Sequence, residues 1–207
     1  MTTILLIRHG ETAYVASGRL SGRLPGVPLN DKGRQEAARI AEALRDAPIK
    51  AIYSSPIQRA VETAEPLAQA LGLPVQIREG LIETNAGNWQ GKTLKQVART
   101  KLWKIVMEQP SQFQFPGGET FLEVQQRIVQ ALDGVAKEHD EKDIVACFSH
   151  GDPIKLAIAH YLCMPLDSFQ RIGMNTGSLT ILHLGNTRPH LGPINQLFDL
   201  EWPGPKP

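Results

Sequence analysis

Cysteine is scarce in this sequence, with two in 207 residues. Two cysteines cannot build a framework of several disulfides, which small secreted domains use in place of a large core. Cys147 lies within a hydrophobic run and Cys163 near the end of a predicted helix. We therefore expect both to be small buried residues in a protein from a reducing compartment.

An excess of charge is also lacking, because 22 Lys and Arg residues oppose 21 Asp and Glu residues. A net charge of +1 gives no electrostatic basis for binding nucleic acid or an anionic membrane surface. Any affinity for an anion must then come from a local cluster. No apolar stretch is long enough to span a bilayer, and the N-terminal residues lack the features of a signal peptide. These absences predict a cytoplasmic protein that binds neither nucleic acid nor membrane.

The composition that remains is that of an ordinary globular domain, with 42% hydrophobic and 21% charged residues. Segments with the character of buried strands alternate with segments of helical periodicity, and we find no repeat or linker. This pattern predicts one domain over residues 1–200 with a frayed tail at 201–207. The expected fold class is α/β, a three-layer α/β/α sandwich around a mixed but mainly parallel sheet.

The predicted strands cover residues 4–7, 51–54, 73–77, 143–148, 178–184 and 190–197. Five helices are predicted between these strands. The first follows a cap at Asn30 or Asp31, the second begins at Ser55-Pro56, and the third spans 94–106. The fourth follows the turn at 115–119, and the fifth spans 153–162.

Two of the predicted strands end in the same way. The first runs into Arg8, His9 and Gly10, and the strand over residues 143–148 runs into Ser149-His150-Gly151. In an open α/β sheet, ligands bind at the carboxyl ends of the strands. Arginine offers a planar fork of donors for phosphate or carboxylate, and a neutral imidazole nitrogen is nucleophilic near pH 7. We therefore expect the two histidines to converge on one site.

A metal centre is the main alternative for a pair of histidines. No carboxylate or cysteine lies at a familiar ligand spacing such as His-x-x-x-His. Arg8 at the strand end and Arg59 in the first turns of a predicted helix would also disfavour a cation nearby. The residue types therefore favour a phosphate pocket and predict no metal site.

The chain resembles the histidine phosphatase superfamily, the phosphoglycerate-mutase-like proteins of branch 1. The motifs that carry the resemblance follow the family's order between about residues 3 and 155: Arg8-His-Gly-Glu-Thr12, Leu29-Asn-Asp-Lys-Gly33, Ser54-Ser-Pro-Ile-Gln-Arg-Ala60 with Thr63-Ala64, Leu81-Ile-Glu83 with Gly87-Asn-Trp89, Pro116-Gly-Gly-Glu119 and Ser149-His-Gly151. The first motif is moderately specific, and the ordered set is very specific.

The resemblance implies a phosphoglycerate-mutase-like fold and a role for each matching residue. His9 corresponds to the nucleophile that becomes a phosphohistidine, and Arg8 and Arg59 correspond to the arginines that bind the phosphate. His150 corresponds to the second histidine, which hydrogen-bonds the transferring phosphoryl group. Glu83 corresponds to the carboxyl that protonates the leaving oxygen, which helps because an alkoxide leaves poorly without a proton. The implied reaction is metal-independent hydrolysis of a small phosphorylated metabolite, with no cofactor.

Other residues near these motifs are candidates for contacts with the rest of the substrate, although a surface role suits several of them equally well. They are Thr12, Arg19, Ser21, Gly22, Arg23, Gly151 and Lys155. The chain departs from the family pattern at Val15, where many members have an asparagine that reaches the phosphate, and at Gln90, where a glutamate is common. The substrate itself cannot be predicted from these residues.

Two other functions remain open. A phosphomutase would return the phosphoryl group to a second hydroxyl, and the stretch 149–155 resembles a branch often labelled phosphomutase. Cofactor-dependent mutases of the family carry an inserted segment after the region of Glu83, and this chain is too compact for it, which favours hydrolysis. A non-catalytic binding module would be expected to lack His9 or His150, and both are present. Whether the chain forms a homodimer is open.

Overall fold

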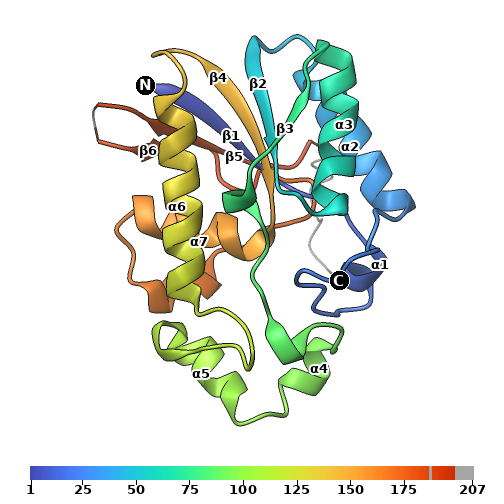
Figure 1. The fold of residues 1–207 in the computed structure, drawn as a ribbon, viewed down its shortest axis with the longest axis vertical. Coiled ribbons are helices and arrows are strands. Elements are labelled where there is room, and N and C mark those ends of the chain that lie inside the picture. Colours follow the sequence, from blue (N-terminus) through green and yellow to red (C-terminus); the bar gives the residue numbers. More distant parts are fainter. Residues whose placement is uncertain (187, 199–207) are drawn as a thin grey trace, which may run out of the picture.

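A computed structural model of the chain describes residues 1–186 and 188–198. In this part of the chain six strands form one sheet in the order β3-β2-β4-β1-β5-β6 (Figure 1). The strands are β1 (Thr2–Arg8), β2 (Ile49–Ser54), β3 (Val75–Ile77), β4 (Ile144–Ser149), β5 (Leu179–Leu184) and β6 (His190–Leu191). The pairs β1–β4, β2–β4 and β2–β3 are parallel, whereas β5 and β6 are antiparallel to their neighbours. The predicted mixed, mainly parallel sheet is confirmed.

Helices cover both faces of the sheet, as predicted for a three-layer sandwich (Figure 1). Strand β1 is buried on both sides, which explains its unbroken apolar run. Its Leu5 and Ile7 face the cluster under α2 (Asp31–Leu44) and α3 (Gln58–Leu71). The alternate residues Ile4 and Leu6 face the cluster under α6 (Phe121–Lys137) and α7 (Gly151–Tyr161).

A third apolar cluster lies under the segment 84–120, which we call the cap. It contains the short helices α4 (Leu94–Val97) and α5 (Leu102–Glu108) and lies beyond the carboxyl ends of the central strands (Figure 1). The rings of Trp89, Phe113 and Phe115 meet there with centroids 4.8–5.6 Å apart. Such aromatic contacts stabilise a segment that has no strand of its own.

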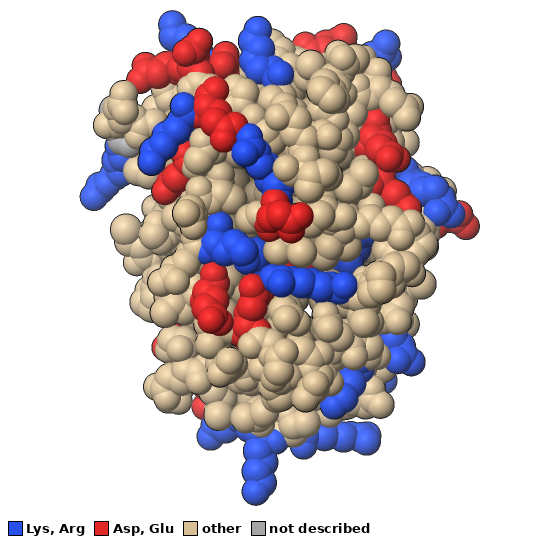
Figure 2. All heavy atoms as spheres, in the orientation of Figure 1, with Lys and Arg blue, Asp and Glu red and all other residues tan. Residues whose placement is uncertain are grey.

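Several helix ends follow from local capping. The side chain of Asn30 accepts a hydrogen bond from the amide of Gly33, which confirms the predicted cap of α2. Thr120 and Glu123 form a capping box at the start of α6. On the face drawn in Figure 2, Lys and Arg are mixed with Asp and Glu over the sheet layers, whereas mainly Lys and Arg are visible at the end formed by the cap.

Four local predictions were wrong. The helix expected from Ser55 begins only at Gln58, and its first residues have no side-chain cap. The helix expected over 94–106 is broken, because the Thr100 hydroxyl bonds the carbonyl of Val97 and competes with the helical pattern. Cys163, expected to be buried, is exposed. The strand expected over 190–197 has two residues, after which Gly192, Pro193 and Gln196 form separate backbone hydrogen bonds with β5.

Among residues 1–186 and 188–198, no helix is both long and apolar enough to cross a bilayer. The predicted frayed tail at 201–207 lies outside the described residues, and the assignment of 1–200 to a single domain stays a prediction.

Candidate active site

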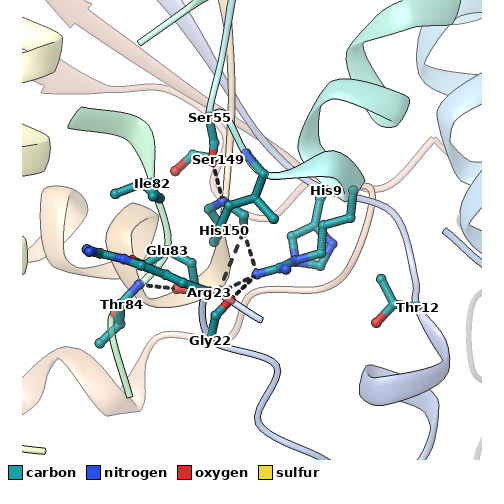
Figure 3. A network of polar contacts seen from close by, with 12 residues as sticks. His9, Thr12, Gly22, Arg23, Ser55, Ile82, Glu83, Thr84, Ser149 and His150 are labelled. Atoms are coloured by element: carbon teal, nitrogen blue, oxygen red, sulfur yellow. Dashed lines mark hydrogen bonds and ion pairs between the residues drawn. The ribbon is translucent and has the colours of Figure 1, made fainter. Parts of the chain in front are cut away.

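The sheet brings the two His-Gly strand ends together. In the parallel pair β1–β4, Arg8 is in register with Ser149, so His9 and His150 follow side by side. The backbone amide of His9 donates to the carbonyl of Ser149 over 3.0 Å, and the centroids of the two imidazole rings lie 5.1 Å apart. The predicted convergence is therefore present (Figure 3).

The hydrogen bonds of His9 show which of its ring nitrogens carries the proton. Nδ1 lies 2.7 Å from the carbonyl oxygen of Gly10, which can only accept, so Nδ1 carries the proton. Nε2 accepts from Nε of Arg59 over 3.0 Å. Burial, with the cations Arg59 and Arg8 nearby, holds the pKa of His9 well below its usual value. His9 is thus a neutral imidazole with its lone pair on Nε2, where it accepts the hydrogen bond from Arg59.

Arg59 lies fully buried between the two histidines. Its Nη2 donates to the carbonyl of Gly22 over 2.9 Å and lies 3.2 Å from Nδ1 of His150. On the other side of that ring, Nε2 lies 2.7 Å from Oγ of Ser55. Burial and the neighbouring Arg59 hold the pKa of His150 well below its usual value. The ring of His150 is thus fixed from both sides.

Two guanidinium donors at this site have no protein acceptor. They are Nη1 of Arg59 and Nε of Arg8, both fully buried within the described part of the chain. Buried donors are almost always paired, because leaving one unpaired costs about 1–3 kcal/mol. Unpaired cationic donors on Arg8 and Arg59, the two arginines near His9, therefore indicate a place for an anion with several oxygens, such as a phosphoryl group.

Glu83 is the carboxyl nearest to the two histidines. Its Oε1 accepts from the amide of Thr84 over 2.9 Å, and its Oε2 lies 3.7 Å from Nδ1 of His150 and 3.8 Å from Nη2 of Arg59. Burial raises the pKa of Glu83, although the charge of Arg59 opposes this effect. The carboxyl therefore keeps its proton to a higher pH than an exposed glutamate, which suits a general acid.

The fold also assembles a set of metal-ligand types that sequence spacing did not predict. One ligand atom each of His9, Glu83 and His150 lies within 4.8 Å of the others. However, the nitrogens of both rings that face the site already contact the Arg59 guanidinium. A fixed cation at the centre of the set makes it a better site for an anion than for a divalent metal.

A cavity of about 260 Å³ opens beside His9. Its wall includes Arg8 and Glu83 and five of the predicted substrate contacts: Arg19, Ser21, Gly22, Gly151 and Lys155. Val15, Leu20, Leu94, Phe115 and Met174 supply an apolar part of the wall, so the Val15 departure replaces a polar contact with an apolar one. Arg59 and His150 lie behind the wall.

Two predicted substrate contacts do not line this cavity. Thr12 is buried, and its hydroxyl caps the short helix α1 (Ala13–Ala16) by accepting from the amide of Val15. Arg23 does not line the cavity either, and its Nε donates to the carbonyl of Glu83 while its Nη2 pairs with Glu119. The side chains of both residues thus form hydrogen bonds with other groups of the protein.

Two supporting residues lie inside the family motifs but received no role from the sequence. Ser55 holds His150, and Thr63 accepts from the amide of Gly10 while donating to the carbonyl of Arg59. Gly10 itself passes so close to α2 that an added Cβ would lie 2.5 Å from the carbonyl oxygen of Gly33. The only available signal for Ser55 and Thr63 was their position in the motif around Arg59.

Comparisons with known proteins agree with this geometry. A sequence model of the histidine phosphatase superfamily (branch 1) matches residues 4–196. Phosphoserine phosphatase 1 of Hydrogenobacter thermophilus is 29% identical over 91% of this chain and 89% of that protein. Glucosyl-3-phosphoglycerate phosphatase of Mycolicibacterium vanbaalenii is 30% identical over 96% of this chain and 91% of that protein. The solved structure of YhfR from Bacillus stearothermophilus superposes with a TM-score of 0.89 at 31% identity, covering 95% of this chain and 98% of that one.

Proposed function

This chain belongs to the histidine phosphatase superfamily, branch 1, and on that basis we propose that it is a metal-independent phosphatase of a small phosphorylated metabolite. The observation that carries the proposal is a neutral His9, with its lone pair on Nε2, beside Arg8 and Arg59, each of which has a buried donor without a protein acceptor. The similar phosphoserine and glucosyl-3-phosphoglycerate phosphatases support this class of substrate. The location of the enzyme in the cytoplasm stays a prediction.

In the proposed reaction, Nε2 of His9 attacks phosphorus and the bond to the leaving oxygen breaks. Glu83 gives its proton to that oxygen, so the alcohol leaves neutral. The guanidinium groups of Arg8 and Arg59 stabilise the charge that spreads over the phosphoryl oxygens, and His150 completes the pocket. Water then attacks the phosphohistidine and returns a proton to Glu83. The N–P bond breaks, which restores His9 and releases inorganic phosphate.

The proposal is tested by measuring phosphate release from a panel of phosphorylated metabolites, including phosphoserine, sugar phosphates and phosphoglycerates. We expect inorganic phosphate from at least one ester. An isomerised phosphate ester formed without phosphate release would instead identify a mutase.

Exhaustive chelation is expected to leave turnover unchanged, because Arg59 and Arg8 supply the positive charge that a metal would supply. The measurement is phosphate release after dialysis against EDTA, together with elemental analysis of the protein. Loss of activity that one particular metal restores would show that His9, Glu83 and His150 act as ligands instead.

The rate for an alkyl phosphate is expected to fall on both sides of a pH plateau. At low pH, His9 takes up a proton and loses its lone pair, but its lowered pKa moves this loss below the usual range of histidine. At high pH, Glu83 loses the proton that it must donate, and its raised pKa moves this loss above the usual range of glutamate. The alkaline fall should be absent for p-nitrophenyl phosphate, whose leaving group needs no proton. Identical profiles for the two esters would contradict the assignment.

A further inference from the structure

Three charged side chains outside the cavity surround the segment that carries Glu83. Glu119, which follows the glycine turn of the cap, places its two carboxylate oxygens on two arginines. Its Oε1 lies 2.7 Å from Nη2 of Arg23, and its Oε2 lies 3.2 Å from Nη2 of Arg127 on α6. All three side chains are only 20–29% exposed, so these ion pairs are partly shielded from solvent. We call this group the Glu119 clamp.

The clamp bonds the backbone on both sides of Glu83. Before it, Nη1 of Arg127 donates to the carbonyls of Gly80 and Ile82 over 3.1 and 2.7 Å. At the residue itself, Nε of Arg23 donates to the carbonyl of Glu83 over 2.8 Å (Figure 3). After it, Oε2 of Glu119 accepts from the amide of Asn85 over 2.8 Å, and the amide of Glu119 donates to the carbonyl of Asn85 over 3.0 Å.

These contacts are concentrated where the local fold gives little support. The segment after β3 continues through single turns of 3₁₀ helix, with no strand or α-helix to fix its backbone. A Cβ added at Gly80 would lie 2.5 Å from Cβ of Ala131, so the backbone at Gly80 packs directly against α6. From Ile82 to Asn85, side chains of the clamp bond the carbonyls of Ile82 and Glu83 and the amide of Asn85.

No member of the clamp lines the cavity beside His9. Arg23 and Arg127 donate to backbone carbonyls, and the single negative charge of Glu119 lies between these two cations while it bonds the amide of Asn85. Without Glu119, two partly buried guanidinium groups would face each other with no counter-charge.

We propose that the Glu119 clamp is a positioning device that holds the carboxyl of Glu83 within reach of the leaving oxygen. This inference rests on the proposed phosphatase function and extends it to residues that do not touch the substrate. A displacement of about 1 Å can cost about 10²-fold in rate for a group that must meet a reacting atom. Loss of the clamp should therefore slow the protonation of the leaving group and leave the attack by His9 largely unaffected.

The test compares Glu119→Gln with wild type on an alkyl phosphate and on p-nitrophenyl phosphate. Glutamine has one acceptor oxygen in place of two and no charge, so it cannot satisfy both arginines and the amide of Asn85. We expect kcat for the alkyl ester to fall about 10- to 100-fold and kcat for the aryl ester to change by about twofold or less. The matched control is Glu62→Gln, because Glu62 also accepts from a backbone amide, that of Leu29, but lies outside the clamp. It should leave the ratio of the two rates unchanged.

A double variant separates positioning from a general loss of structure. In the Glu83→Gln background, Glu119→Gln should have almost no further effect on the alkyl ester, because the group that it positions is already gone. If Glu119→Gln fails to fold, Arg23→Gln takes its place, since it removes only the bond to the Glu83 carbonyl and one ion pair.

Each result decides between the two claims. Equal slowing of both esters, no slowing of either, or full additivity with Glu83→Gln would overturn the clamp while the phosphatase function stands. A wild-type protein that releases phosphate from no ester of the metabolite panel and none from p-nitrophenyl phosphate would overturn the proposed function, and the clamp with it.

Discussion

Replacing His9 with alanine is expected to reduce phosphate release by about 10⁴-fold or more, since removal of a nucleophile from a covalent mechanism leaves only the catalysis by the remaining groups. The variant should still fold, because His9 lies at the end of β1 and the sheet register of Arg8 with Ser149 does not depend on its ring. The intermediate provides a second measurement. Rapid quenching of wild type during turnover should trap a phosphate that is labile to acid and stable to alkali, on the peptide that contains His9.

The matched control for this variant is His160→Ala. His160 lies in the last turn of α7 and is exposed, and it does not line the cavity. It should retain wild-type turnover and yield the same trapped phosphate. Substantial activity in a folded His9→Ala variant, or phosphate trapped on another residue, would rule out the covalent mechanism through His9.

The centre of this site could be predicted because its residues sit at the ends of buried strands. The run from Ile4 to Ile7 is apolar at every position, which identifies a strand covered on both faces. A guanidinium and an imidazole add nothing to the packing of a buried strand, so Arg8 and His9 at its end indicate a ligand-binding or catalytic site. Parallel strands bring their carboxyl ends to one edge, which is why a second His-Gly pair after β4 could be expected to lie nearby.

The supporting contacts could not be predicted because they join residues far apart in the chain. Ser55 before a proline has the local pattern of a helix cap, but its hydroxyl binds His150, 95 positions later. Arg23, a cation in a glycine-rich loop, is typical of a substrate contact, but its partner Glu119 lies 96 positions away. Local preference does not determine which distant acceptor a side chain reaches, so these contacts depend on the tertiary fold.

The structure also narrows the choice of general acid. Glu11 and Asp152 each lie two residues beyond a key histidine and are the alternatives to Glu83. The carboxylate of Glu11 is occupied by Asn30 and Lys32, at 3.0 and 2.9 Å, and it does not line the cavity. Asp152 does line the cavity, but its Oδ1 is already paired with the ammonium of Lys155 at 2.8 Å. Glu83 lines the cavity, lies near both histidines and has a raised pKa, which favours it as the acid.

Glu83→Gln is expected to slow hydrolysis of an alkyl phosphate by about 10²–10⁴-fold, the usual value of general acid catalysis. Glutamine keeps the size and the acceptor oxygen for the amide of Thr84 but has no acidic proton to give. Hydrolysis of p-nitrophenyl phosphate should slow far less, and phosphohistidine should still form from it. Glu79→Gln, an exposed glutamate on the same segment, is the matched control and should change neither rate. Equal slowing of both esters would mean that Glu83 positions the substrate, and Asp152 would then be the next acid to test, because Glu11 is held away from the cavity.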